Sequence, residues 1–226
     1  MTKLELITRV GERLGDTSAD FLTILGRVFE DVLAELAAND CIKSLRKTAT
    51  FTFTANTMNY DTRVITGLAA GHYPMDIISL RIPSWQYAAK LERFSEADFD
   101  NWRSIYTDSV GVAIPGAPKG WRLYPNDQQL QVIPVPRAQD VITNGVEILY
   151  LKPPAALASG DTITEIRDEH IPALIAGMRK HGLVFQTETL QDLPDAIREF
   201  ENWKIRMRGE AQRERGRAIR TRYRDF

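Results

Sequence analysis

The sequence lacks the features of a secreted, disulfide-bonded or membrane-spanning protein. Among 226 residues there is one cysteine, Cys41, so no disulfide can form within the chain, and this favours a reducing compartment. No apolar run approaches the length that crosses a bilayer. The first residues also lack the basic-then-apolar order of a signal peptide. We therefore expect a soluble protein with no membrane partner and a buried, unreactive Cys41.

Strong catalytic signatures are missing as well. There is no glycine loop for phosphate, no G-x-S-x-G elbow, no HExxH and no paired C-x-x-C. The densest polar cluster is the stretch TEIRDEHIP, which contains Glu165, Asp168, Glu169 and His170. These residue types could hold a metal ion or serve a hydrolase, but acidic side chains also suit the positive end of a helix. We favour the helix start, and predict no catalytic, cofactor-binding or metal site and no enzymatic activity.

Charge is distributed unevenly along the chain. Nine basic and three acidic residues give residues 204–226 a net charge of +6, so residues 1–203 carry −7 of the total of −1. Near the end, arginine recurs at every second position, at Arg213, Arg215, Arg217, Arg220, Arg222 and Arg224. This spacing suits an extended arm better than one face of a helix. Such an arm could bind an acidic groove of another protein or bind nucleic acid, or it could be a solvated, disordered end with no partner.

The order of the predicted elements is helices, strands, helices. The capping pair Thr2 and Glu5 begins the first helix, and residues 18–38 carry an apolar sector wide enough for two neighbours. Period-two or apolar segments predict strands at 48–54, 75–82, 120–125, 130–135 and 146–151, with a helix at 95–106. Helical patterns return around Pro172 and Pro194.

We therefore predict an α+β fold in which a helical bundle, formed by the N- and C-terminal helices, has a small β-rich subdomain inserted in it and an extended basic C-terminal arm. The predicted boundaries are 1–47 for the N-terminal helices, 48–155 for the β-rich subdomain with one short helix, 156–212 for the C-terminal helices and 213–226 for the arm.

Two neighbouring segments are candidates for contacts with other molecules. In GVAIPGAPKG, residues 111–120, glycine and proline surround Val112, Ala113 and Ile114, so this is a loop whose apolar residues are either tucked under or offered to another subunit. In KGWRLYPNDQQLQVIPVP, residues 119–136, two strands flank a polar turn. Pro134 and Pro136 cannot donate to a strand ladder, so we predict that this hairpin is peripheral in the sheet.

The order and spacing of these motifs resemble the head-to-tail adaptor proteins of tailed bacteriophages, the connectors of the neck that bind beneath the portal. The resemblance covers residues 2–212 and is carried by ATFTFT, YPMDIISLRI, FSEADFDNW, APKGWRLYPNDQQLQVIPVP and VEILYLKPPAALASGDTITEI. It implies a structural virion component, made and assembled in the host bacterial cytoplasm. It also implies a dodecameric ring that extends the DNA channel and provides the tail attachment site.

The resemblance further implies particular partners and residues. The partners are the portal ring, a tail or nozzle protein, other copies of the chain, and genomic DNA that passes without sequence-specific binding. The implied portal-docking arm contains Arg213, Arg215, Arg217, Arg220, Arg222, Tyr223, Arg224 and Phe226. The implied subunit or tail interface contains Ile114, Pro118, Trp121, Tyr124, Pro134 and Pro136. The alternative is a nucleic-acid-binding protein that acts through the same basic arm, with salt-dependent affinity for DNA.

Overall fold

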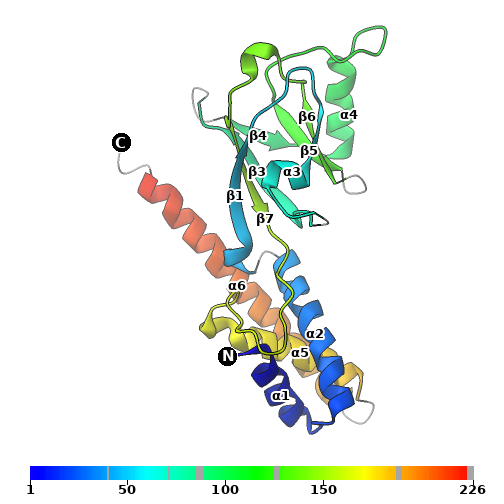
Figure 1. Cartoon of the computed structure of the whole chain (residues 1–226), viewed down its shortest axis with the longest axis vertical. Helices are drawn as coiled ribbons and strands as arrows, with labels where there is room; N and C mark the ends of the chain where they lie inside the picture. The colour runs from blue at the N-terminus through cyan, green and yellow to red at the C-terminus, as the bar shows by residue number, and fades with distance from the viewer. Residues whose placement is uncertain (40, 71, 85–88, 125–127, 187–189, 223–226) are drawn as a thin grey trace. The chain divides into compact units, whose positions relative to one another are not determined.

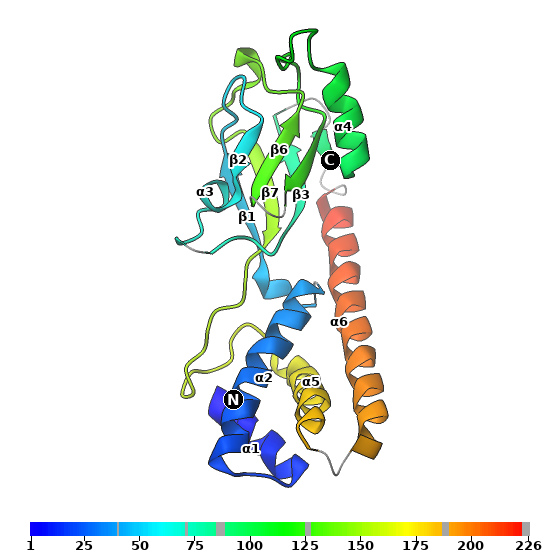
Figure 2. The same ribbon diagram turned by 90° about the vertical axis from the view of Figure 1, so that its right-hand side faces the viewer.

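The computed structural model describes the chain except residues 40, 71, 85–88, 125–127, 187–189 and 223–226, and for residues 89, 190, 211–212 and 214–222 it describes the backbone alone. The chain folds as two compact units (Figures 1 and 2). We call Met1–Leu45 with Pro154–Phe226 the helical unit, and Arg46–Pro153 the sheet unit. The fold is therefore mixed α/β.

The helical unit consists of α1 (Lys3–Leu14), α2 (Ala19–Ala38), α5 (Ile171–Val184) and α6 (Leu193–Arg222). In Figure 2, α5 lies between α2 and α6, and it also contacts α1. Gly177 permits this close packing: a Cβ atom there would lie 2.5 Å from Val32 Cγ1 on α2 and 2.7 Å from Phe200 Cε2 on α6. The centre of α5 is therefore matched in shape to both neighbours.

Local signals in the sequence explain where these helices begin. The Thr2 hydroxyl accepts a hydrogen bond from Glu5 N (3.2 Å), and the Glu5 carboxylate accepts one from Thr2 N (2.8 Å), which is the predicted capping box. Ser18 caps α2, whose broad apolar sector packs against both α1 and α5 as expected. Cys41 is buried, also as expected.

The sheet unit contains seven described strands and two helices. The strands are β1 (Arg46–Phe51), β2 (Asn59–Asp61), β3 (Asp76–Ile82), β4 (Ala89–Arg93), β5 (Gly120–Tyr124), β6 (Gln129–Ile133) and β7 (Val146–Leu151). Their order in the sheet is β1-β7-β3-β4-β5-β6-β2, and neighbours are antiparallel except β4 and β5. The helices are α3 (Thr62–Thr66) and α4 (Glu96–Ile105). The core of the unit includes Phe51, Phe53, Ile77, Leu80, Trp121, Val132 and Ile148.

The hairpin formed by β5 and β6 has a different place from the one predicted. Strand β6 ends at Ile133, so Pro134 and Pro136 fall beyond the ladder, as proline requires. However, β2 pairs with the outer side of β6, so the hairpin is not the edge of the sheet. The sequence did not reveal β2 because three residues are too few to show a period of two.

The extended conformation predicted for the C-terminal arm is wrong for residues 213–222. Helix α6 continues to Arg222. The segment contains no proline and is rich in arginine, glutamate and alanine, which favour helix. Tyr223, Arg224 and Phe226 lie outside the described residues.

Candidate interaction surfaces

Among the described residues of the sheet unit, several exposed apolar side chains lie on one loop. Residues 107–114, which we call the apolar loop, follow α4 and extend past its C-terminal end (Figure 1). Val110 is 83% exposed, Val112 is 61% exposed and Ile114 is 43% exposed. Ile105, at the end of α4, is 65% exposed. Val110, Val112 and Ile114 are therefore not tucked under the sheet unit, and the contact with another subunit stays a prediction.

Hydrogen bonds within the apolar loop fix the conformation of its backbone. Asp108 Oδ1 accepts from Val110 N at 3.0 Å and from Val112 N at 2.8 Å, and Asp108 N donates to Val112 O at 2.9 Å. Gly111 has φ of 85°, a conformation that favours glycine, and its N–H donates to Asp108 O. At the base, Ile114 N donates to Tyr106 O at 2.7 Å. The valine side chains are therefore presented by an ordered backbone.

Aromatic rings support the base of the loop. Trp102 is stacked between Phe94 and Tyr106, with 5.8 Å between ring centroids on each side. The Lys119 ammonium lies 5.1 Å from the Trp102 ring centroid, in a cation–π arrangement. The neighbouring Gly116 N donates to Val135 O. These contacts join α4 and the segment after the loop to the sheet.

The six residues predicted as a subunit or tail interface fall into two groups. Pro118, Trp121, Pro134 and Pro136 are buried inside the sheet unit. Trp121 is 1% exposed, and its indole Nε1 donates to Leu91 O at 3.3 Å. Ile114 is exposed and Tyr124 is partly exposed. The interface itself stays a prediction, and the residues that another molecule can reach are Ile114 and Tyr124.

Arg122 is a buried cation that no sequence motif marks. Its guanidinium lies 4.4 Å from the Phe99 ring centroid, and its Nε donates to Gln131 Oε1 at 2.6 Å. Its Nη1 is 3.5 Å from Asp100 Oδ1 and 3.9 Å from Glu96 Oε1, both on α4. Arg122 therefore fastens α4 to β5, which is a structural role.

In the helical unit, one carboxylate collects three cationic or titratable partners. Glu35 Oε1 accepts from Lys204 Nζ at 2.8 Å, while Glu35 Oε2 lies 3.2 Å from His181 Nε2 and 3.4 Å from Lys180 Nζ. Burial would raise the pKa of Glu35, but hydrogen bonds from Lys204 and His181 outweigh it and hold this pKa below its usual value. Burial would lower the pKa of Lys204, but hydrogen bonds to Glu201 and Glu35 raise it. The cluster links α2, α5 and α6.

The polar cluster around His170 forms ion pairs. His170 Nε2 lies 2.9 Å from Glu210 Oε2 on α6 and 4.0 Å from Glu169 Oε1, so three possible metal ligands are close together. However, Arg206 Nε lies 3.2 Å from Glu210 Oε1, and Arg167 Nη1 lies 3.2 Å from Glu169 Oε1. These guanidinium groups already neutralise the carboxylates and would repel a cation.

The same stretch is a helix start, as we predicted. Asp168, Glu169 and His170 form a 3₁₀ turn that leads directly into α5. Glu165 instead faces the preceding loop, where its Oε1 accepts from Ala155 N at 2.9 Å. A hydrogen bond from His170 holds the pKa of Glu210 below its usual value, with a further contribution from Arg206. The cluster therefore attaches α6 to the beginning of α5.

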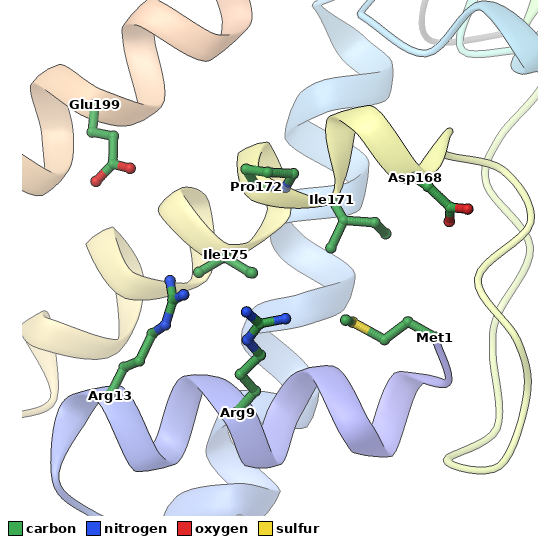
Figure 3. Close-up of a pocket in the computed structure, with 8 residues that line it drawn as sticks. All are labelled: Met1, Arg9, Arg13, Asp168, Ile171, Pro172, Ile175 and Glu199. Atoms are coloured by element: carbon green, nitrogen blue, oxygen red, sulfur yellow. The ribbon is translucent and has the colours of Figure 1, made fainter.

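The helical unit also contains an open cavity of about 460 Å³ (Figure 3). Arg9 and Arg13 extend into it from α1 toward α5, and Asp168 and Glu199 lie on other sides. The remaining lining residues are Met1, Ile171, Pro172 and Ile175. The charged lining residues are thus two arginines and two carboxylates.

The portal-docking arm is described only in part. Arg213 is exposed, and the backbone from 213 to 222 is helical. Just before it, Arg208 Nη2 donates to Asn39 Oδ1 at 2.9 Å, which holds α6 against the end of α2. The role predicted for the arm stays a prediction.

The described residues include no helix that is both long and apolar enough to cross a membrane. A protein-family model described as "SU10 adaptor protein" matches residues 1–224. No curated protein matches the chain.

Proposed function

The chain belongs to the SU10 adaptor protein family of phage head-to-tail adaptors, and on this basis we propose that it forms a dodecameric ring on the portal, extends the DNA channel and provides the tail attachment site. Members of such a family are structural components of the virion neck that bind portal and tail components. The match over residues 1–224 is the observation that carries the proposal. We further infer that the chain is made and assembled in the host bacterial cytoplasm.

The charge distribution supports a role around DNA without specific binding. Residues 1–203 carry −7, which repels phosphates, whereas residues 204–226 carry +6. A channel with a mildly negative wall lets DNA slide, because no row of cations replaces its counterions. Genomic DNA would therefore pass through the ring without sequence-specific contacts.

The basic C-terminal segment is the proposed portal-docking element. Its arginines would orient the segment on an acidic portal surface, since ion pairs at an interface rim steer more than they stabilise. Tyr223 and Phe226 would supply most of the affinity as apolar anchors. The helical continuation of α6 to Arg222 fits this role, because an ordered backbone loses less conformational entropy on binding.

Truncation after Gln212 tests this arrangement. We expect the shortened chain to keep the melting temperature of the full chain, with a circular dichroism signal reduced only by the helical residues that were removed. We also expect it no longer to co-sediment with purified portal rings. Arg198→Gln is the control, because it removes an exposed positive charge from the same helix outside the segment. Undiminished portal binding by the truncated chain would contradict the proposed docking role.

A further inference from the structure

We propose that the open cavity of the helical unit receives the outer face of α2 from the neighbouring copy of the chain. This inference rests on the proposed ring, and it names the two surfaces that join one copy to the next. In this contact the neighbour's α2 places a carboxylate between the two arginines of the cavity and an arginine against its two carboxylates. The match in charge between these two surfaces carries the inference.

The two arginines of the cavity have no ionic partner in the described part of the chain. Arg9 and Arg13 lie one turn apart on α1, are exposed, and extend into the cavity toward α5 (Figure 3). Asp168 and Glu199 line the same cavity, but within the described residues neither arginine forms a salt bridge with them, whereas Glu199 pairs with Arg179 at 3.6 Å. Two like charges one turn apart on a helix repel each other. A carboxylate bound between them would remove this repulsion and accept hydrogen bonds from both guanidinium groups.

The outer face of α2 offers the complementary charges. Arg27 and Asp31 lie one turn apart on this face and are exposed. Among the described residues neither of them forms a salt bridge, although Glu30 beside them is paired with Lys3 of α1. The carboxylate that α2 turns toward α1 is therefore satisfied within the chain, while the charges that α2 turns outward are available to another molecule.

The cavity and the outer face of α2 lie on different sides of the helical unit. The described lining residues come from α1, α5, α6 and the segments just before α1 and α5. Helix α2 packs its buried face against α1 and α5, and in Figure 3 its pale blue ribbon passes behind both of them. Its exposed face therefore points away from the cavity, so one copy can use both surfaces at once with two different neighbours. Such a contact between two different surfaces is the kind that closes into a ring.

The composition of the cavity favours a helix face of this kind over nucleic acid. The carboxylates of Asp168 and Glu199 would repel a phosphate backbone, which is bound by cations alone. A helix with one cation and one carboxylate a turn apart can pair with both signs in the cavity. Met1 and Pro172 are exposed in the lining, and they offer apolar contact to the aliphatic stem of an incoming Arg27.

The test reverses the charges of the contact while purified portal rings are filled with the chain. At an amount that fills half of the sites, native mass spectrometry should find wild type as full rings beside empty ones, because each bound copy helps its neighbour to bind. Arg9→Glu with Arg13→Glu places like charges opposite Asp31. Partly filled rings should then replace the full ones, and the concentration for half filling should rise at least about tenfold. Adding Asp31→Arg to the same chain restores opposite charges and should restore full rings.

The rescue by Asp31→Arg distinguishes a contact between copies from a role in folding. Arg103→Glu with Lys90→Glu is the matched control, because it reverses two exposed charges of the sheet unit and should fill rings as wild type does. Since Arg9 and Arg13 are exposed, the double variant should melt like wild type. If it does not, Arg9→Glu alone, with and without Asp31→Arg, provides a milder series.

The possible results are distinguishable from one another. Full rings formed by Arg9→Glu with Arg13→Glu would overturn the inference, and so would partly filled rings that persist after Asp31→Arg is added. Either result would leave the adaptor function standing, with the copies joined through other surfaces. Partly filled rings with wild type would also overturn the inference, because bound copies would then not assist one another. A wild-type chain that does not bind portal rings at all would overturn the proposed function itself.

Discussion

At the scale of residues, charged side chains hold the helical unit together. Lys204 is largely buried and contacts Glu35 on α2 as well as Glu201 on its own helix. Its ammonium also lies 5.0 Å from the Phe200 ring centroid. A buried ammonium is stable only when such partners replace its lost water. Lys204 and Glu35 therefore tie α6 to α2 through electrostatics as well as apolar packing.

This cluster predicts that the chain loses stability in acid. The folded pKa of Glu35 lies below its ordinary value of 4.5, so the unfolded chain binds more protons in this range. The stabilisation is present above pH 4.5 and is lost as pH falls through the folded pKa. We expect Glu35→Gln to lower the melting temperature at pH 7 by about 4 °C, which corresponds to roughly 1–2 kcal/mol. Its melting temperature should then fall less steeply than that of wild type as the pH is lowered below 4.5, because the variant has no carboxylate to protonate at this position.

The control for this experiment is Arg198→Gln. The Arg198–Asp195 pair is exposed on both sides, so its loss should shift the melting temperature by no more than about 1 °C. Parallel pH profiles for Glu35→Gln and wild type would show that Glu35 does not carry the acid sensitivity.

At the scale of elements, the position of α5 between α2 and α6 depends on the small size of Gly177. A methyl group there would lie under 3.0 Å from both Val32 and Phe200. Alanine favours helix over glycine by about 1 kcal/mol, but crowding against two packed helices costs more. Shape at this one position therefore limits how closely three helices approach.

We predict that Gly177→Ala lowers the stability of the helical unit by about 1–3 kcal/mol. Thermal unfolding followed by circular dichroism measures the change. Gly160→Ala is the control, because a Cβ atom there would have nothing within 4 Å and should be tolerated. Equal stability of the two variants would mean that α2 and α6 shift without cost, contrary to this account of the packing.

The sequence predicted the elements that local rules govern. The capping box at Thr2, the strand at 146–151 and the helix after Ser95 were all found where their residues placed them. Short strands such as β2 were missed because only their pairing defines them. The arm was predicted as extended because alternation of arginines was given more weight than their helix propensity.

Candidate contacts were harder to predict, because they depend on residues far apart in the chain. His170 and Glu210 are 40 residues apart, and Glu35 and Lys204 are 169 apart, so spacing gave no sign of either pair. For GVAIPGAPKG, composition identified a loop but left two interpretations of its apolar residues. The exposure of Val112 and Ile114 argues against the tucked-under interpretation, and burial also shows that Trp121 is a core residue.

At the scale of the whole molecule, the chain combines two units with two different surface chemistries. The helical unit ends in the basic segment, and the sheet unit displays the apolar loop. A connector between two assemblies needs two contacts that do not compete for the same partner, and surfaces of opposite chemistry provide this separation. The chain belongs to the SU10 adaptor protein family, whose members bind portal and tail components of the virion.

The role as a ring-forming connector is tested by the native mass of the complex between the purified chain and a purified portal ring. We expect a complex of fixed composition, with one copy of the chain for each portal subunit and no partially filled species at saturation. A chain that stays separate from the portal, or that binds it in a ratio that varies with concentration, would contradict the assignment as a ring-forming connector.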